Sequence, residues 1–166
     1  CHIYISIIML NSTHYLLTDK MKKTLIALAV ALCCAVGAQA RDEVVRDVTY
    51  LPKPAQSFLT RNFKSEISFI KIDKTLGYIT DYEVVLTDGT EIDFNRDGSW
   101  DNIEMPVSKA VPSGLVPKQI ADYVAKNFPK QKIVSIDKES HGYDIELQNG
   151  LDLVFDKAGQ FKKIDD

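Results

Sequence analysis

The chain has 166 residues, of which 45% are hydrophobic and 26% charged, a composition typical of one or two small globular domains rather than of a disordered or fibrous protein. The 20 basic and 23 acidic side chains give a formal net charge of −3. This balance argues against a nucleic-acid partner, because proteins that bind nucleic acids present a basic surface to the phosphates.

Residues 21–40, MKKTLIALAVALCCAVGAQA, have the layout of a secretory signal peptide. Two lysines follow the methionine, an apolar stretch runs from Leu25 to Val36, and Ala38–Ala40 supply the small residues of a cleavage site. The apolar stretch is shorter than the roughly 20 residues that a membrane-spanning helix needs. We therefore expect cleavage near Ala40 and a periplasmic or secreted mature chain without a membrane span.

Residues 1–20 precede this signal peptide and do not begin with methionine, so we expect them to be translated upstream sequence. The mature chain is then residues 41–166, with 17 basic and 22 acidic side chains. All three cysteines, Cys1, Cys33 and Cys34, precede the cleavage site. The mature protein is therefore predicted to have no disulfide, no thiol chemistry and no cysteine metal site.

The mature chain contains an internal repeat. Three blocks align, namely 51–63 (LPKPAQSFLTRNF) with 116–128 (VPKQIADYVAKNF), 69–74 (FIKIDK) with 133–138 (IVSIDK), and 82–104 with 143–165. Thirteen of the aligned pairs are identical. This similarity predicts a tandem duplication, with the first repeat in residues 41–105 and a linker and the second repeat in residues 106–166.

Each repeat is predicted to form one helix followed by four antiparallel strands. A proline lies at the start of each helix, apolar residues follow at helical spacing, and the later segments alternate between apolar and polar residues. Asp88-Gly89 and Asn149-Gly150 predict tight hairpins, and Asp97-Gly98 and Ala158-Gly159 predict the next turns. The fold class is α+β, with the helices on one face of an antiparallel sheet of eight strands if both repeats share it.

These features together resemble the PepSY-like family of exported proteins, which have the fold of the β-lactamase inhibitor protein. The resemblance covers nearly all of the mature chain and rests on Pro52 with Asn62-Phe63, on Pro117 with Asn127-Phe128, and on the two Gly-x-aromatic turns. It implies a concave sheet backed by helices. For function it implies a periplasmic binding or inhibitory module, and related domains are linked to the restraint of peptidases.

The polar face of the predicted sheet is one candidate site, for a protein or peptide of the cell envelope. Aromatic side chains beside acidic ones suit such a partner, and a merely solvated surface is the alternative. For Trp100, packing at the end of the sheet is an equally good alternative to partner binding, because the corresponding residue in the second repeat, Phe161, is also aromatic. The candidate partner-binding residues are Phe69, Lys71, Glu83, Val85, Glu91, Trp100, Asp144, Glu146 and Asp152, and Asp93, Ile133 and Ser135 are assigned to the same face.

The segment Asp93–Glu104 has the ligand spacing of an EF-hand calcium loop, including a central glycine and a final glutamate. An EF-hand loop needs a helix on each side, whereas the residues before it are predicted to form a strand. The alternative is a solvated β-turn, for which Asn, Asp and Gly are the usual residues. If calcium binds, the candidate ligands are Asp93, Asn95, Asp97, Asp101 and Glu104.

Catalysis has little support in the sequence. His141 is the only histidine of the mature chain, it lies in a predicted turn, and no nucleophile motif surrounds any serine. We therefore expect a non-enzymatic binding module without a catalytic residue. No cofactor is expected, and calcium binding or sensing through residues 93–104 is the alternative function.

Overall fold

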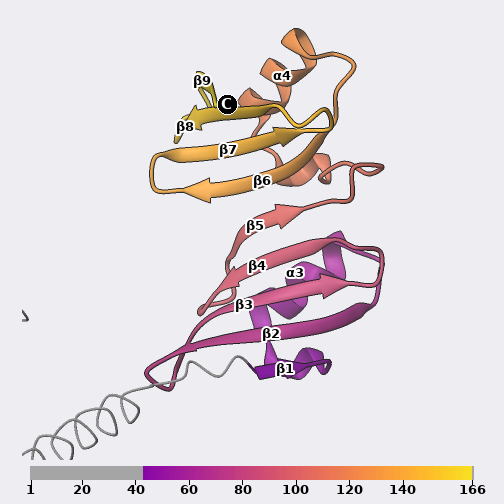
Figure 1. Ribbon diagram of the computed structural model, residues 1–166, viewed down its shortest axis with the longest axis vertical. Coiled ribbons are helices and arrows are strands. Elements are labelled where there is room, and N and C mark those ends of the chain that lie inside the picture. Colours follow the sequence, from indigo (N-terminus) through magenta and orange to yellow (C-terminus); the bar gives the residue numbers. More distant parts are fainter. Residues whose placement is uncertain (1–42, 166) are drawn as a thin grey trace, which may run out of the picture. The chain divides into compact units, whose positions relative to one another are not determined.

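The computed structural model describes residues 43–165, all within one compact unit of the chain (Figure 1). The predicted signal peptide, its cleavage site and the predicted upstream segment lie outside these residues. The helices are α3 (Lys53–Asn62) and α4 (Lys118–Asn127), with short 3₁₀ turns η2 (Val48–Tyr50) and η3 (Ser113–Leu115). The strands are β1 (Glu43–Val45), β2 (Ile67–Thr75), β3 (Tyr78–Leu86), β4 (Glu91–Asn95), β5 (Trp100–Glu104), β6 (Ile133–Glu139), β7 (Gly142–Leu147), β8 (Asp152–Asp156) and β9 (Phe161–Asp165).

The strands form one antiparallel sheet whose spatial order is the sequence order, from β1 to β9. β5 pairs with β6 through Asn102↔Asp137, Ile103↔Ile136 and Glu104↔Ser135, so the two predicted repeats contribute to a single sheet. The sheet has nine strands in place of the expected eight, because the three residues of β1 pair with β2 at its edge. A strand this short carries too few residues to show an alternating pattern.

Each helix begins beside a proline and ends at the Asn-Phe pair noted in the sequence. Pro52 and Pro117 occupy the N-cap positions. At the other end, the amides of Asn62 and Asn127 donate hydrogen bonds to carbonyl oxygens one turn earlier, at 2.9 and 2.8 Å. Each asparagine side chain therefore adds a second hydrogen bond to the last turn of its helix.

The core contains one row of aliphatic side chains that crosses the sheet from β2 to β8. Its members are directly paired across neighbouring strands and have at most 1% of their surface exposed. The row consists of Ile70, Val84, Ile92, Ile103, Ile136, Ile145 and Leu153. Buried side chains of α3 (Ala55 and Leu59) and α4 (Ile120 and Val124) belong to the same cluster.

Aromatic side chains pack against each half of the sheet in the same pattern. From α3, Phe58 contacts Phe94 edge-on and stacks on Trp100, with ring centroids 5.7 and 6.1 Å apart. From α4, Tyr123 contacts Phe155 edge-on and stacks on Phe161, at 5.4 and 4.6 Å. Such pairs add to the stabilisation that burial provides.

The register corrects one block of the sequence alignment. Ile70 pairs with Val84 and Ile136 pairs with Ile145, so Ile70 and Ile136 occupy equivalent places in the two halves. The alignment of FIKIDK with IVSIDK instead matches Ile136 with Ile72, which is two residues out. The cause is that β2 is longer than β6 and has an additional register shift between Asp73 and Lys74.

Candidate functional site

The sheet face opposite the aliphatic core row carries many carboxylates. Side chains alternate between the two faces of a strand, so residues that flank the core positions point away from the core. We define the acidic face by the carboxylates at these positions, Glu83, Glu91, Asp93, Glu104, Asp137, Asp144, Glu146 and Asp152.

These carboxylates face one another across the strands. The direct pairs are Glu83↔Asp93, Glu91↔Glu104, Asp137↔Asp144 and Glu146↔Asp152. Like charges in direct cross-strand positions destabilise a sheet, because their side chains are close together. The fold therefore carries a repulsive charge pattern on this face.

Basic side chains lie toward the ends of the acidic face. Lys71 lies 3.1 Å from Asp73 and 3.7 Å from Glu83, and at the other end Lys163 pairs with Asp165 at 2.7 Å. Between these lysines the directly paired row contains Glu83, Asp93, Asn102, Asp137, Asp144 and Val154, with no basic residue. The centre of the face is therefore acidic.

The carboxyl groups at the centre respond to this environment. Burial, followed by the charges of Glu83, Glu91 and Asp101, raises the pKa of Asp93, which also accepts a hydrogen bond from the Asn102 amide at 3.4 Å. Burial and neighbouring carboxylates also raise the pKa of Asp137 and of Glu91. Loss of solvent and like charges both favour the protonated form of a carboxyl group.

A pocket of about 230 Å³ opens at one end of the acidic face. Its lining contains five carboxylates, of Asp73, Asp81, Glu83, Asp93 and Asp101, together with atoms of Tyr82 and Phe94. Within residues 43–165, no group of three or more His, Cys, Asp or Glu side chains has a geometry that could hold a metal ion.

The structure places most of the predicted partner-binding residues on one side of the sheet. Phe69 and Val85 pair with each other, and Val85 pairs with Glu91, so a half-buried apolar corner adjoins the carboxylates. The direct pairs also place Lys71, Glu83, Asp144, Glu146 and Asp152 on the acidic face. Ser135 lies there as well, between Glu104 and Glu146.

Trp100 and Ile133 lie on the other side of the sheet. A register shift in the β4–β5 pair brings Trp100 opposite Phe94, and its ring stacks on Phe58 of α3. Ile133 is buried in the core, because a register shift in the β6–β7 pair separates it from Ser135. Each irregularity breaks the strict alternation on which the prediction relied.

Sequence reasoning left Asp137 out of this face. Its direct pairing with Asp144 and with Asn102 places it at the centre. The alternation of apolar Val134 and Ile136 with polar Ser135 and Asp137 could have identified it.

The residues of the predicted calcium loop are spread along the β4–β5 hairpin. Asp97 lies in the turn, where its carboxylate accepts hydrogen bonds from the backbone amide and hydroxyl group of Ser99. Asp93 and Glu104 lie in the strands, and Glu104 pairs with Glu91 at the far end from the turn. The hairpin thus does not bring Asp97 and Glu104 together. Asn95 and Asp101 flank the turn, and the Asn95 amide donates to the Ser99 hydroxyl group.

His141 lies in the turn between β6 and β7, where its Nε2 is 2.8 Å from the Asp144 carboxylate. Both side chains are exposed, at 48% and 43%. The contact attaches the turn to the edge of the acidic face.

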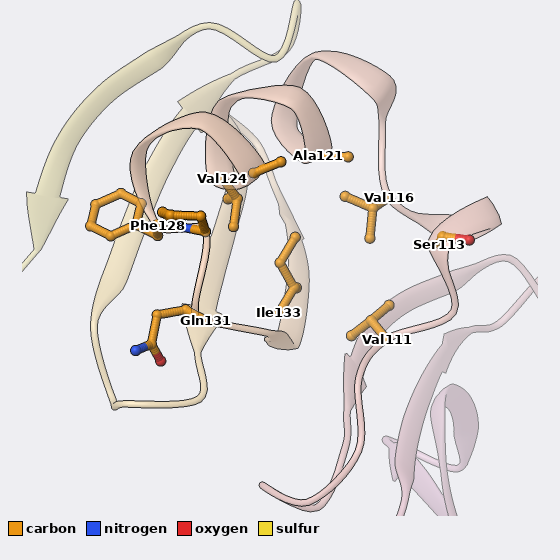
Figure 2. A pocket seen from close by; sticks show the side chains of 10 residues that line it. Val111, Ser113, Val116, Ala121, Val124, Phe128, Gln131 and Ile133 are labelled. Atoms are coloured by element: carbon orange, nitrogen blue, oxygen red, sulfur yellow. The ribbon is translucent and has the colours of Figure 1, made fainter.

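A second, apolar pocket of about 260 Å³ lies between the linker and α4, away from the acidic face. Figure 2 shows Val111 and Val116, which precede α4, opposite Val124 of α4, with Ile133 on the strand side and Phe128 and Gln131 nearby. The pocket has no titratable side chain in its lining. Among the described residues, no helix is long and apolar enough to cross a membrane.

Comparison with known proteins identifies the class to which this fold belongs. The family model described as "Putative beta-lactamase-inhibitor-like, PepSY-like" matches residues 80–163. The chain therefore belongs to the PepSY-like family, as its repeat and turn motifs predicted. No curated protein matches the chain.

Several solved structures share the fold, among them those of three periplasmic proteins. A periplasmic protein of unknown function from Bacteroides vulgatus ATCC 8482 is 38% identical, with a TM-score of 0.71, and the match covers 76% of this chain and 100% of that one. A second protein from the same organism, of the DUF2874 family, is 30% identical, with a TM-score of 0.69 and coverage of 78% and 100%.

The third is described as a "putative calcium-regulated periplasmic protein" from Bacteroides thetaiotaomicron. It is 29% identical, with a TM-score of 0.69, and the match covers 75% of this chain and 97% of that one. These relatives and the family agree on the compartment. The protein is thus a periplasmic PepSY-like protein.

Proposed function

We propose that the protein is a non-enzymatic binding module that holds a basic segment of a periplasmic protein or peptide against its acidic face. A peptidase or an envelope sensor is the kind of partner that the family resemblance suggests, and binding could inhibit it. The half-buried corner formed by Phe69 and Val85 would supply apolar contact beside the charges.

The observation that carries the proposal is the set of four direct acid–acid pairs within the acidic face. A surface needed only for solubility has no reason to place carboxylates opposite one another, because alternating charges would stabilise the strands. A basic partner would relieve the repulsion at all four pairs. Charge complementarity of this kind also increases the association rate and the specificity of a complex.

The same geometry argues for binding rather than catalysis. His141 is exposed in a turn, and its 2.8 Å contact is to a carboxylate, without a nucleophile beside it in the described hydrogen bonds. Nucleophilic catalysis needs a base and a nucleophile within hydrogen-bond reach of each other.

Calcium binding is the second candidate, favoured by the description of the Bacteroides thetaiotaomicron relative as calcium-regulated. The predicted ligands are Asp93, Asn95, Asp97, Asp101 and Glu104, but the hairpin keeps Asp97 and Glu104 apart, so one calcium ion would use only part of this set. If calcium binds the folded state only, a concentration of 100 times its Kd should stabilise the fold by about 2.7 kcal/mol. Thermal melting with millimolar calcium, repeated with Asp97→Ala, tests this, and an unchanged melting temperature contradicts it.

We also propose that the two halves are copies of one unit, a helix on one face of four strands. The matching contacts of Phe58 and Tyr123, and of the Asn62 and Asn127 amides, support this. Under this proposal Trp100 and Phe161 are equivalent, so Trp100→Phe should keep the same fold.

The test of the main proposal uses photocrosslinking from the acidic face in the periplasm. A crosslinking amino acid at Glu91 should trap one partner, whereas the same group at the exposed Lys126 of α4 should not. The partner is then identified by mass spectrometry and purified, and its affinity is measured. We expect the affinity to fall as salt is added, because screening weakens attraction between exposed charges. A partner that binds equally in low and high salt contradicts the proposal.

A further inference from the structure

The β2–β3 hairpin ends in the two-residue turn Leu76–Gly77, closed by the pair Thr75↔Tyr78. β2 and β3 have nine residues each, whereas β6 and β7 have seven and six. Figure 1 shows the tip of this hairpin reaching beyond the turn between β4 and β5. The first hairpin is therefore an extension that the second half lacks.

Two large apolar side chains occupy this tip and are almost fully exposed. Leu76 has 82% of its surface exposed and Tyr78 has 71%, the two highest values among the large hydrophobic residues described. Neither belongs to the hydrophobic core or to the residues packed against it. The stability of the fold does not explain their presence.

The backbone at the tip makes the leucine more unusual. Leu76 has a φ of +52° and Gly77 a φ of +81°, and Leu76 is the only non-glycine residue with positive φ among those described. Turns with two left-handed residues favour Asn-Gly, because asparagine tolerates this conformation and a large aliphatic residue does not. Leu76 therefore strains the turn without contributing packing in return.

The charges behind the tip indicate what kind of surface it fits. Asp73 and Asp81 form a direct pair close behind the turn, and both line the acidic pocket. Two lysines lie nearby as well, and each faces a carboxylate: Lys71 lies 3.1 Å from Asp73, and Lys74 lies 2.6 Å from Glu43. An anionic lipid surface would repel the aspartate pair, whereas a protein pocket with basic side chains at its rim would attract it. The arrangement is an apolar tip with a base in which carboxylates outnumber lysines.

We propose that the Leu76–Tyr78 tip inserts into an apolar pocket of the partner protein, whose basic rim meets Asp73 and Asp81. The apolar tip is the anchor, and the acidic face fixes its orientation. Exposed apolar side chains that enter a pocket contribute much of the affinity in protein complexes. This inference rests on the proposed function in one respect, namely that the partner carries basic side chains.

The test places a photocrosslinking amino acid at Tyr78 of the full chain in cells, with Val107, which is 65% exposed on the linker, as the control position. The trapped protein is identified and purified, and its Kd is measured for the wild type, Leu76→Asn and Val107→Ser. Leu76→Asn removes the anchor but suits the turn, so it should melt at least as high as the wild type. We expect it to bind at least tenfold more weakly, with Val107→Ser unchanged.

Equal binding of Leu76→Asn and the wild type would overturn the inference, as would the absence of a crosslink specific to position 78. Binding to vesicles of phosphatidylethanolamine and phosphatidylglycerol through the tip would also overturn it. If Asp93→Asn/Asp137→Asn weakens binding and Leu76→Asn does not, the inference about the tip is wrong and the proposed function stands. If neither variant weakens binding, both fail.

Discussion

The ammonium group of Lys138 lies 3.1 Å from the centre of the Trp100 ring and donates a hydrogen bond to the Trp100 carbonyl oxygen at 2.9 Å. Lys138 belongs to β6 and Trp100 to β5, the strands that join the two halves of the sheet. Phe58 of α3 stacks on the same indole. The tryptophan is therefore fixed from both halves at the junction.

Replacing Lys138 with methionine should weaken this junction. The variant keeps an apolar stem but loses the cation–π contact and the hydrogen bond, and we expect a loss of about 1–2 kcal/mol in the free energy of unfolding. Urea denaturation followed by tryptophan fluorescence measures this. Lys126→Met, on the exposed side of α4, is the matched control and should change stability by less than about 0.5 kcal/mol. Equal effects of the two variants would contradict this role.

Neutralising one carboxylate of the acidic face should stabilise the fold. Asp93 lies directly opposite Glu83, so Asp93→Asn is expected to raise the free energy of unfolding at pH 7 by about 0.5–1 kcal/mol. The control, Asp122→Asn, removes a carboxylate that pairs with Lys118 at 2.5 Å on the surface of α4 and should not stabilise. A less stable Asp93→Asn variant would show that the charge repulsion is not the dominant effect.

The acidic face also predicts how stability depends on pH. Burial and like charges raise the folded-state pKa of Asp93, Asp137 and Glu91 above the unfolded values, so the folded state binds more protons between the two values. Stability contributed by these groups should therefore rise as the pH falls from 7 through the raised pKa values. Urea denaturation between pH 7 and pH 4.5 tests this, and Asp93→Asn should flatten the rise.

For Asp88 we expect the opposite dependence of stability on pH, in more acidic solution. Burial opposes its ionisation, but hydrogen bonds from Lys109, Ser65 and Thr90 outweigh this and hold the pKa of Asp88 well below its usual range. Because the folded-state pKa is lowered, stability from this group should be lost as the pH falls below about 4. Asp88→Asn should cost about 1 kcal/mol at pH 7 and reduce the loss in acid. Asp81→Asn is the control, and an equal acid loss in both variants would contradict this.

Much of the fold could be predicted because the sequence signals are local. The turn at Asn149-Gly150 follows from the preference of such pairs for hairpins, and Gly150 has the expected positive φ. The irregularities could not be predicted in this way. The register shift after Asp93 brings Trp100 to the helix-covered side, and alternation alone places it on the polar side.

The candidate site was predicted in part for the same reason. Residues such as Glu83 and Glu146 follow from regular alternation, and their strands are regular at those positions. The direct pairing of acids depends on how neighbouring strands align, which a single sequence does not determine. The contact between Lys138 and Trp100 also depends on the pairing of β5 with β6.

One glycine is required by close approach of the backbone. A Cβ at Gly142 would lie 2.1 Å from the carbonyl oxygen of Phe155, so Gly142→Ala must displace β8 from β7. We expect a loss of at least about 3 kcal/mol, measured by urea denaturation. Gly150→Ala has open space around its Cβ and should cost only about 1 kcal/mol, from its positive φ. Similar losses in both variants would contradict this account.

The most direct test of the central claim uses the partner that is crosslinked at Glu91. Its affinity is measured for two double variants of this protein. Asp93→Asn/Asp137→Asn and Glu66→Gln/Asp122→Asn change the net charge equally, but only the first alters the acidic face. We predict that the first variant is at least as stable as the wild type and binds at least tenfold more weakly, with the second unchanged in binding. Equal affinities for the two variants would contradict binding through the acidic face.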